Sequence, residues 1–211
     1  MERNQSNVSE DIRAGHSDVD LVAKWIISSG IQSDQGGFFA WFNLQDKSYS
    51  YLYSEITGYG ITSLLFLYKI FGEKAFIDKA ELAADWIISK SIHSCGGVKT
   101  RLYEDNKKAD KRYCFTGEKI FSFDTGIVLY GIINLYKLTR KAKYLQISES
   151  LADFIIDKMH QQDGSLSPIY DAKIGETIES EDKWSNQQSG FHAKVSMGMV
   201  DLYGIKRNDK Y

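Results

Sequence analysis

The sequence predicts an all-α domain built from three helical-hairpin repeats of about 68 residues. The main observation is internal similarity. The segments "TGYGITSLLFLY" (57–68) and "TGIVLYGIINLY" (125–136) lie 68 positions apart and share their first and last residue pairs. A third copy ends in "MVDLY" (199–203), 67 positions after the second. The chain also has a single proline, Pro168, as expected of helices, because proline disrupts a helix interior.

Each repeat is expected to combine an amphipathic outer helix with an inner helix that is apolar on every side. The second outer helix shows the pattern, with apolar residues at helical spacing along one face: Phe76, Ala80, Ala83, Ala84, Ile87 and Ile88. The inner helices are predicted near 56–70, 125–138 and 191–204. We assign the repeats to about 19–72, 73–140 and 141–207, within a domain spanning 19–211 that follows a polar tail at 1–18.

A long connection containing a glycine turn ("DQGGFF", "SCGGVK", "QQDGSL") follows each outer helix. These connections cover roughly 31–54, 92–122 and 161–189. Loops of this length in a compact domain usually carry function. Because the units repeat, all three connections are expected to emerge on the same face of the domain. We predict a functional site on that face.

The composition excludes several classes of protein. A formal net charge of −2 gives no basic surplus, so we expect no nucleic-acid partner. No run is long and apolar enough for a signal peptide or a membrane span, so we expect a cytoplasmic protein with no membrane partner. The two cysteines, Cys95 and Cys114, are too few for a disulfide framework and match no compact zinc pattern. We expect neither a metal nor another cofactor.

Three motifs in register, "YSEITGYG" (53–60), "FDTG" (123–126) and "QQDGS" (161–165), carry a resemblance to known families. The pattern resembles the α/α toroids, which include glycoside hydrolases, sugar epimerases, polysaccharide lyases and the terpene-cyclase group. It is most similar to uncharacterised helical-repeat proteins found alongside polysaccharide-biosynthesis enzymes, and the resemblance covers about residues 19–205. Leu166 departs from the aromatic residue of the usual toroid turn.

The resemblance implies only part of a toroid. Six hairpins close such a ring, and only three can be recognised in this sequence. An open arc would leave apolar helices uncovered at both ends, and contiguous apolar patches are rarely left in water. Either the arc collapses into a bundle that hides its own ends, or a partner copy covers them. We expect the second, and therefore a homo-oligomer.

Two acids, Glu55 and Asp124, stand at the predicted starts of the first two inner helices. One interpretation is helix capping, which suits Asp124 better than the longer Glu55. The other is catalytic: parallel helices bring their N-termini together, so the two acids would share one pocket. A helix N-terminus favours ionised acids, so we expect base, nucleophile or hydroxyl-binding roles. His192 occupies the opening of the third inner helix and is expected either to be structural or to transfer protons.

Candidate ligand-binding residues lie in the long connections and near the helix starts. Aromatic side chains there either pack the loops or provide flat surfaces for sugar rings, and we select Trp41, Tyr53 and Trp184. Arg101 and Lys194 would meet a carboxylate or phosphate on the ligand, although Lys194 also fits a solvated helix start.

The toroid resemblance implies a protein that acts on or binds a carbohydrate or other glycan ligand. If it is an enzyme, we expect a glycosidase, a lyase or a sugar epimerase, with Glu55, Asp124 and His192 as catalytic residues. The alternative is a non-catalytic helical-repeat scaffold or binding module. An isoprenoid-type toroid enzyme is a second alternative, which the absence of an Asp-x-Asp-Asp stretch disfavours.

Overall fold

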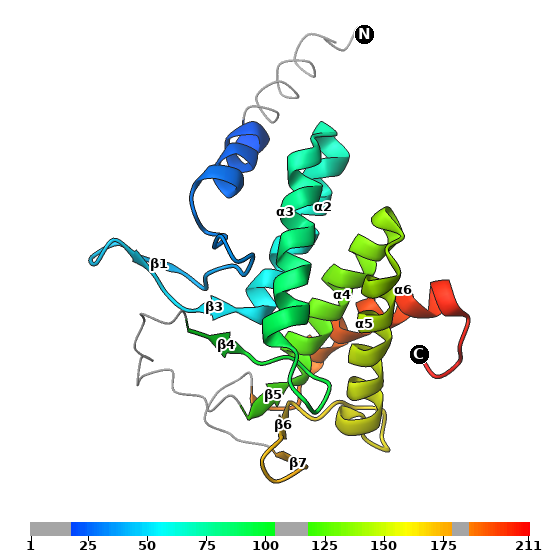
Figure 1. Ribbon diagram of the computed structural model, residues 1–211. Coiled ribbons are helices and arrows are strands. Elements are labelled where there is room, and N and C mark those ends of the chain that lie inside the picture. The colour runs from blue at the N-terminus through cyan, green and yellow to red at the C-terminus, as the bar shows by residue number, and fades with distance from the viewer. Residues whose placement is uncertain (1–17, 104–117, 179–185) are drawn as a thin grey trace, which may run out of the picture.

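The computed structural model describes residues 18–103, 118–178 and 186–211, and it confirms the predicted all-α class and the repeat register (Figure 1). The first two inner helices are α2 (Ser54–Phe71) and α4 (Ser122–Thr139). The third inner helix begins as a 3-10 helix (Gly190–Val195) and continues as α6 (Ser196–Lys206). The chain leaves each inner helix through a left-handed residue, which ends the helix and reverses the chain: Gly72, Arg140 and Arg207.

The outer helices are residues 18–28, α3 (Lys74–Trp86) and α5 (Ala142–Phe154). The last two continue into π-helical turns of five residues, Ile87–Ser91 and Ile155–Met159. Each short connection from an inner to an outer helix joins the two helices of an antiparallel hairpin, such as α2 and α3 or α4 and α5. The polar tail was predicted at 1–18, and its residues 1–17 lie outside the described ranges.

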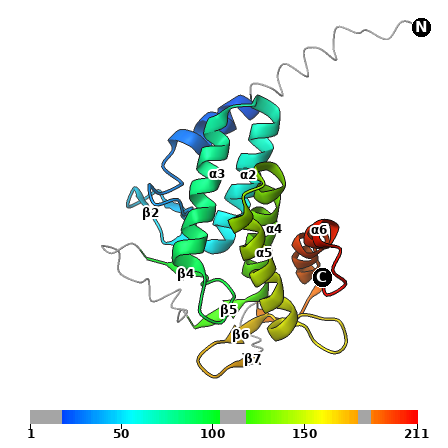
Figure 2. The same ribbon diagram turned by 45° about the vertical axis from the view of Figure 1, so that its right-hand side comes forward.

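Helix α4 is the centre of the domain and contacts α2, α5 and α6 (Figure 2). Its aliphatic residues from Ile127 to Leu135 are all buried, as the sequence predicted, whereas Leu138 in its last turn is exposed. Glycines let α2 and α4 approach closely. A Cβ on Gly58 would lie 2.9 Å from the carbonyl oxygen of Ile127, and a Cβ on Gly131 would lie 2.8 Å from the carbonyl oxygen of Gly58. This contact fixes the relative position of the two helix starts.

The long connections contain short antiparallel strands, which the expectation of an almost entirely helical chain had missed. They are β1 (Phe42–Asn43), β2 (Ser48–Tyr49), β3 (Leu52–Tyr53), β4 (Arg101–Leu102), β5 (Lys119–Phe121), β6 (Ile169–Asp171) and β7 (Glu176–Ile178). Strand β3 of the first connection pairs with β4 of the second, and β5 of the second pairs with β6 of the third. Neighbouring connections therefore run side by side on one face of the domain and satisfy each other's backbone hydrogen bonds.

Exposed large apolar side chains gather at the two ends of the row of hairpins. At the first end they lie on helix 18–28 (Leu21, Val22 and Trp25) and on α2 (Phe66 and Ile70). At the other end they lie on α6 (Met197, Val200 and Tyr203). Figures 1 and 2 show helix 18–28 and α6 on opposite sides of the body formed by α2 to α5. Within the described ranges, no helix combines the length and the hydrophobicity needed to cross a membrane.

Candidate active site

The two acids lie in the first turns of neighbouring parallel helices, Glu55 in α2 and Asp124 in α4. Their positions in the repeat differ by one residue, because Ser54 and Ser122 both start a helix and Glu55 follows directly whereas Asp124 comes one residue later. One residue rotates a side chain by about 100° around a helix axis. The two carboxyl groups therefore leave their helices in different directions, which lets them interact across the α2–α4 contact.

Neither acid is the N-cap residue of its helix, although both lie in the first helical turn, as the capping interpretation supposed. The N-cap residues are Tyr53 and Phe121, both with extended backbone, and these two described helix starts have no side-chain cap hydrogen bond. Glu55 lies two residues after its N-cap and Asp124 three residues after its own, where the backbone is already helical. In the first turn an acid interacts favourably with the helix dipole without being the cap.

Asp124 is buried, with only 4% of its surface exposed. Burial raises the pKa of its carboxyl group well above the usual range, and the charge of Glu55 raises that pKa further. The neighbouring Thr100 hydroxyl and Arg101 guanidinium oppose the rise. Oδ2 of Asp124 has no hydrogen-bond partner among the residues that the structure describes. Asp124 therefore keeps its proton to higher pH than an exposed aspartate does.

Glu55 is half-buried, and burial raises its pKa as well. Two neighbours oppose that rise: the Tyr53 hydroxyl, which donates a hydrogen bond to the carboxylate, and the ammonium group of Lys194. Both pKa shifts run against the expectation that the helix N-termini would favour ionised acids, because desolvation outweighs the helix dipole at this depth. The pair is thus asymmetric: burial favours the protonated form of Asp124, whereas Tyr53 and Lys194 favour the ionised form of Glu55.

Aromatic side chains extend from the acid pair along the long connections. Burial raises the pKa of the Tyr53 hydroxyl, and the nearby charges of Asp124 and Glu55 raise it further, so this group stays a proton donor. The ring of Tyr53 lies 6.0 Å from that of Tyr51, which in turn contacts Tyr103 at 5.5 Å and Trp41 at 5.0 Å between ring centroids. The predicted Trp41 therefore joins the site through Tyr51. Together these four rings form an aromatic row beside the acids.

Both predicted cations lie at the site. Arg101, on β4 and paired with Tyr53 in the strand register, places its guanidinium 4.8 Å from the centre of the Tyr51 ring. Lys194, in the 3-10 helix, extends its Nζ to 5.9 Å from the centre of the Tyr59 ring. Arg101 acts on Asp124 and Lys194 acts on Glu55. Each acid therefore has its own neighbouring cation.

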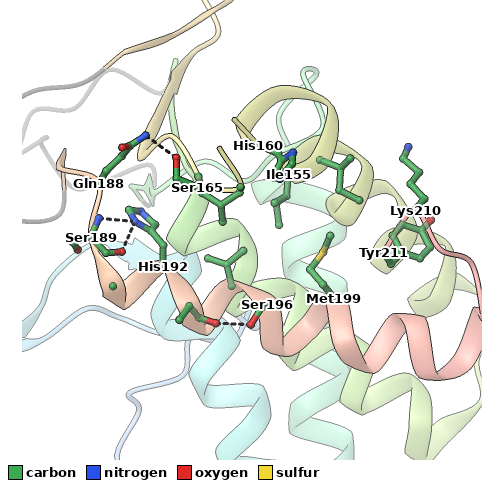
Figure 3. A pocket seen from close by; sticks show the side chains of 16 residues that line it. Ile155, His160, Ser165, Gln188, Ser189, His192, Ser196, Met199, Lys210 and Tyr211 are labelled. Atoms are coloured by element: carbon green, nitrogen blue, oxygen red, sulfur yellow. Dashed lines mark hydrogen bonds between the residues drawn. The ribbon is translucent and has the colours of Figure 1, made fainter. Parts of the chain in front are cut away.

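His192 is not with the acids. Its Nδ1 contacts the backbone of Ser189, its ring lies against that of Phe191, and it lines a cavity that includes neither Glu55 nor Asp124 (Figure 3). The repeat explains the difference, since the 67-residue offset places His192 at the position of Thr125, whose hydroxyl faces the preceding glycine turn. Burial lowers the pKa of His192, which favours the neutral ring. Trp184 lies outside the described residues.

The structure adds two residues that the sequence reasoning did not select. Tyr59 lies one helical turn after Glu55, and that spacing could have identified it, because residues four apart share a helix face. Thr100 reaches Asp124 from a neighbouring connection, and no local pattern marks it. In the described part of the chain, no three His, Cys, Asp or Glu side chains come together in a way that could hold a metal ion.

A family model described as glycosyl hydrolase family 76 matches residues 19–207. No curated protein matches the sequence. Among solved structures, a family 76 alpha-mannanase from Bacteroides thetaiotaomicron is 13% identical with a TM-score of 0.63, over 83% of this chain and 45% of its own. Cellobiose 2-epimerase from Bacillus thermoamylovorans is 16% identical with a TM-score of 0.71, over 90% of this chain and 50% of its own. These similarities show the toroid fold, of which this chain spans about half.

A third structure bears on the acids. It is an inactive alpha-1,6-mannanase from a Salegentibacter species with alpha-1,6-mannotetrose, in which two adjacent aspartates are replaced by alanine. Its identity is 14%, and its TM-score is 0.57 over 74% of this chain and 42% of its own. The present sequence contains no two adjacent aspartates. Its interacting carboxyl groups come instead from two different helices.

Proposed function

The chain belongs to glycosyl hydrolase family 76, and on that premise we propose that Glu55 and Asp124 together cleave a glycosidic bond. The observation that carries this proposal is the placement of the two acids at adjoining helix starts, where burial raises the pKa of both and the charge of Glu55 raises that of Asp124 further. Glycosidases generally need one carboxyl group that carries a proton and one that is ionised. Burial favours the proton on Asp124, and Tyr53 and Lys194 favour the ionised form of Glu55, which supports that combination.

Asp124 is the proposed general acid. Its proton passes to the glycosidic oxygen as the bond from that oxygen to the anomeric carbon breaks. Glu55 takes the second role, either removing a proton from the attacking water or attacking the anomeric carbon directly. Both routes consume one water. In the first, the proton of that water ends on Glu55, which passes it to solvent while Asp124 regains a proton from solvent; in the second, Asp124 takes its proton back from the water that releases the sugar from Glu55. Measuring the anomeric form of the first product by NMR distinguishes the two routes.

The aromatic row supports a saccharide substrate, because sugar rings pack their apolar faces on aromatic side chains. Tyr51, Tyr103 and Trp41 would hold a sugar next to the acid pair. An α-1,6-linked manno-oligosaccharide is the first substrate to test, since a similar structure binds such a ligand. The cytoplasmic location and the role in polysaccharide biosynthesis stay predictions.

The direct test measures release of reducing ends from α-1,6-linked manno-oligosaccharides and from a panel of other glycans. We expect wild-type turnover and a loss of roughly 10²–10⁴-fold in Glu55→Gln and in Asp124→Asn. Asp163→Asn, which changes an exposed acid in the third glycine turn, is the matched control and should retain full activity. Equal rates in all four proteins would refute the assignment of the acids.

A non-catalytic glycan-binding module is the second candidate, and the absence of an Asp-Asp pair favours it. Calorimetry with the same oligosaccharides separates the two functions. A binding module would bind without turnover, and Trp41→Ala would then weaken binding while Asp124→Asn would not.

A further inference from the structure

The first outer helix exposes positions that the other two outer helices bury. The sequences "LVAKWIIS" (21–28) and "LAADWIIS" (82–89) are closely similar, and "SLADFIID" (150–157) occupies the same place in the third repeat. The aromatic residue of this motif is 3% exposed in α3 (Trp86) and 3% exposed in α5 (Phe154). Its counterpart Trp25 is 57% exposed. The first outer helix thus shares the sequence motif of the other two, but its aromatic residue is not packed against other described residues.

The buried aromatic residues each pack on the glycine turn of the repeat before them. A Cβ on Gly37 would lie 2.6 Å from the Trp86 ring, and a Cβ on Gly97 would lie 2.7 Å from the Phe154 ring. Each turn therefore forms a seat for the aromatic side chain of the next outer helix. Trp25 has no preceding turn within the described residues.

The third turn has a similar backbone, and no outer helix follows it within the described residues. Its hydrogen bonds repeat those of the first two turns, so Gly164 corresponds to Gly36 and Gly96, and all three have positive φ. A Cβ on Gly164 would meet no described atom within 4 Å. The turn instead borders a cavity of about 640 Å³ between the π-helical turn Ile155–Met159, the 3-10 helix and α6 (Figure 3). Its apolar lining includes Ile155, Ile156, Leu166, Ala193, Val195 and Met199.

We propose that a second copy of this chain docks its helix 18–28 at this cavity, with its Trp25 on the third glycine turn. The same contact repeated by the other copy would close a two-fold ring of six hairpins. In that ring, each exposed first helix covers the exposed face of the partner's α6. Ser165 carries a Cβ where Gly37 and Gly97 have none, so the Trp25 ring would sit further out from the turn, over Gly164.

One observation favours a second copy as the occupant. The exposed Trp25 (the knob) and the unfilled third turn (the seat) lie at opposite ends of the described chain, so one 180° rotation brings each into contact with its counterpart at once.

The first test is sedimentation velocity on the full chain from about 1 to 100 μM. We expect a dimer, and Trp25→Ala should raise its dissociation constant at least about 30-fold, as loss of a central aromatic contact does in other interfaces. Leu44→Ala, which removes an exposed leucine from the β1–β2 hairpin, is the matched control and should not change the constant. A wild-type monomer at 100 μM, or a Trp25→Ala protein that dimerises normally, would overturn the proposal.

A mixing experiment tests the pairing of knob and seat. Ala193→Trp fills the cavity and leaves Trp25 intact, whereas Trp25→Ala removes the knob and leaves the cavity intact. Each variant alone should be monomeric with a wild-type circular-dichroism spectrum. Mixed together they should form a heterodimer through one restored contact, weaker than wild type. Absence of the heterodimer would refute the pairing, whether or not the acid pair proves catalytic.

Discussion

Two regions of the domain are built from equivalent inner helices and differ in packing. The contact between α2 and α4 is tightly packed, whereas α6 at the end of the domain has an open face. At the first, glycines bring two backbones together, and Asp124 is removed from water. At the second, a cavity adjoins the helix, and Val200 and Met197 are exposed. A Cβ added to Gly204 would meet no described atom within 4 Å. The repeat places an inner helix start in both regions. Only burial between two such starts raises the pKa of the acids that lie there.

The largest expected effect comes from breaking the asymmetry of the acid pair. Asp124→Asn should slow hydrolysis of oligosaccharides by roughly 10²–10⁴-fold, because the departing sugar needs a proton. An aryl glycoside with a good leaving group needs little protonation, so the same variant should be much less impaired on it. Glu55→Gln should be impaired on both substrates. Equal losses of Asp124→Asn on the two substrates, measured as kcat/KM, would remove Asp124 from the general-acid role.

A glycine-to-alanine change should destabilise the protein at the close α2–α4 contact and stabilise it in the open helix α6. Gly58→Ala places a methyl group against the backbone of Ile127 and should lower the free energy of unfolding by about 1–3 kcal/mol. Gly204→Ala, in the helix at the open end, should raise it by about 0.5–1 kcal/mol, because alanine favours the helix. Urea unfolding of both proteins measures the difference. Similar changes in the two variants would contradict the contrast between these regions.

Burial of Asp124 should make stability depend on pH. The folded state binds this proton more tightly than the unfolded state, so the contribution is favourable at low pH and is lost as pH rises above the unfolded value. Asp124→Asn removes the dependence and should raise the Tm at pH 8 by a few degrees, with little change near pH 4. Ser165 lowers the pKa of the exposed Asp163, so Asp163→Asn should show the opposite sign. Thermal melts across this range would reveal both trends.

The smallest effect should come from Lys194, the residue that the open end contributes to the acid pair. Its charge lowers the pKa of Glu55, so Lys194→Met should move the acidic limb of the pH–rate profile to higher pH. Because Lys194 is exposed, the rate near neutral pH should fall only a few-fold, in line with an interaction worth about 0.2–1 kcal/mol. Lys194→Arg should restore the profile. An unchanged acidic limb would mean that Lys194 does not act on Glu55.

The sequence predicted the inner helices closely because their signal is local and repeated. Thr57 and Thr125 open the matching segments, and the observed helices α2 and α4 begin three residues before each threonine. The strands were missed because each is two or three residues long and pairs with a distant connection, as Tyr53 does with Arg101. No periodicity within one segment carries that information.

The acid pair was predictable and its electrostatics were not. Repeat alignment placed Glu55 and Asp124 at adjacent helix starts, but desolvation depends on what surrounds them, such as Thr100 and the backbone contact at Gly58. His192 was misplaced for a different reason. Counting back from Tyr203 places it at the threonine position, whereas the prediction considered only its closeness to a helix start.

The π-helical turns that follow α3 and α5 correspond to the end of the first outer helix, which has one more residue at this point. Equivalent hydrogen bonds identify Ile31, Ser91 and Met159 as the same position of the repeat. The first outer helix reaches it with one more residue and a left-handed Gly30 in place of the π turn. An added glycine before Ser91 should therefore convert the π turn into an ordinary helix end without moving the turn that follows. A residue added inside α4 would instead rotate every later side chain of that helix by about 100°. We therefore expect the chain to tolerate a one-residue insertion best at the ends of the outer helices. There the repeats already differ in length by one residue.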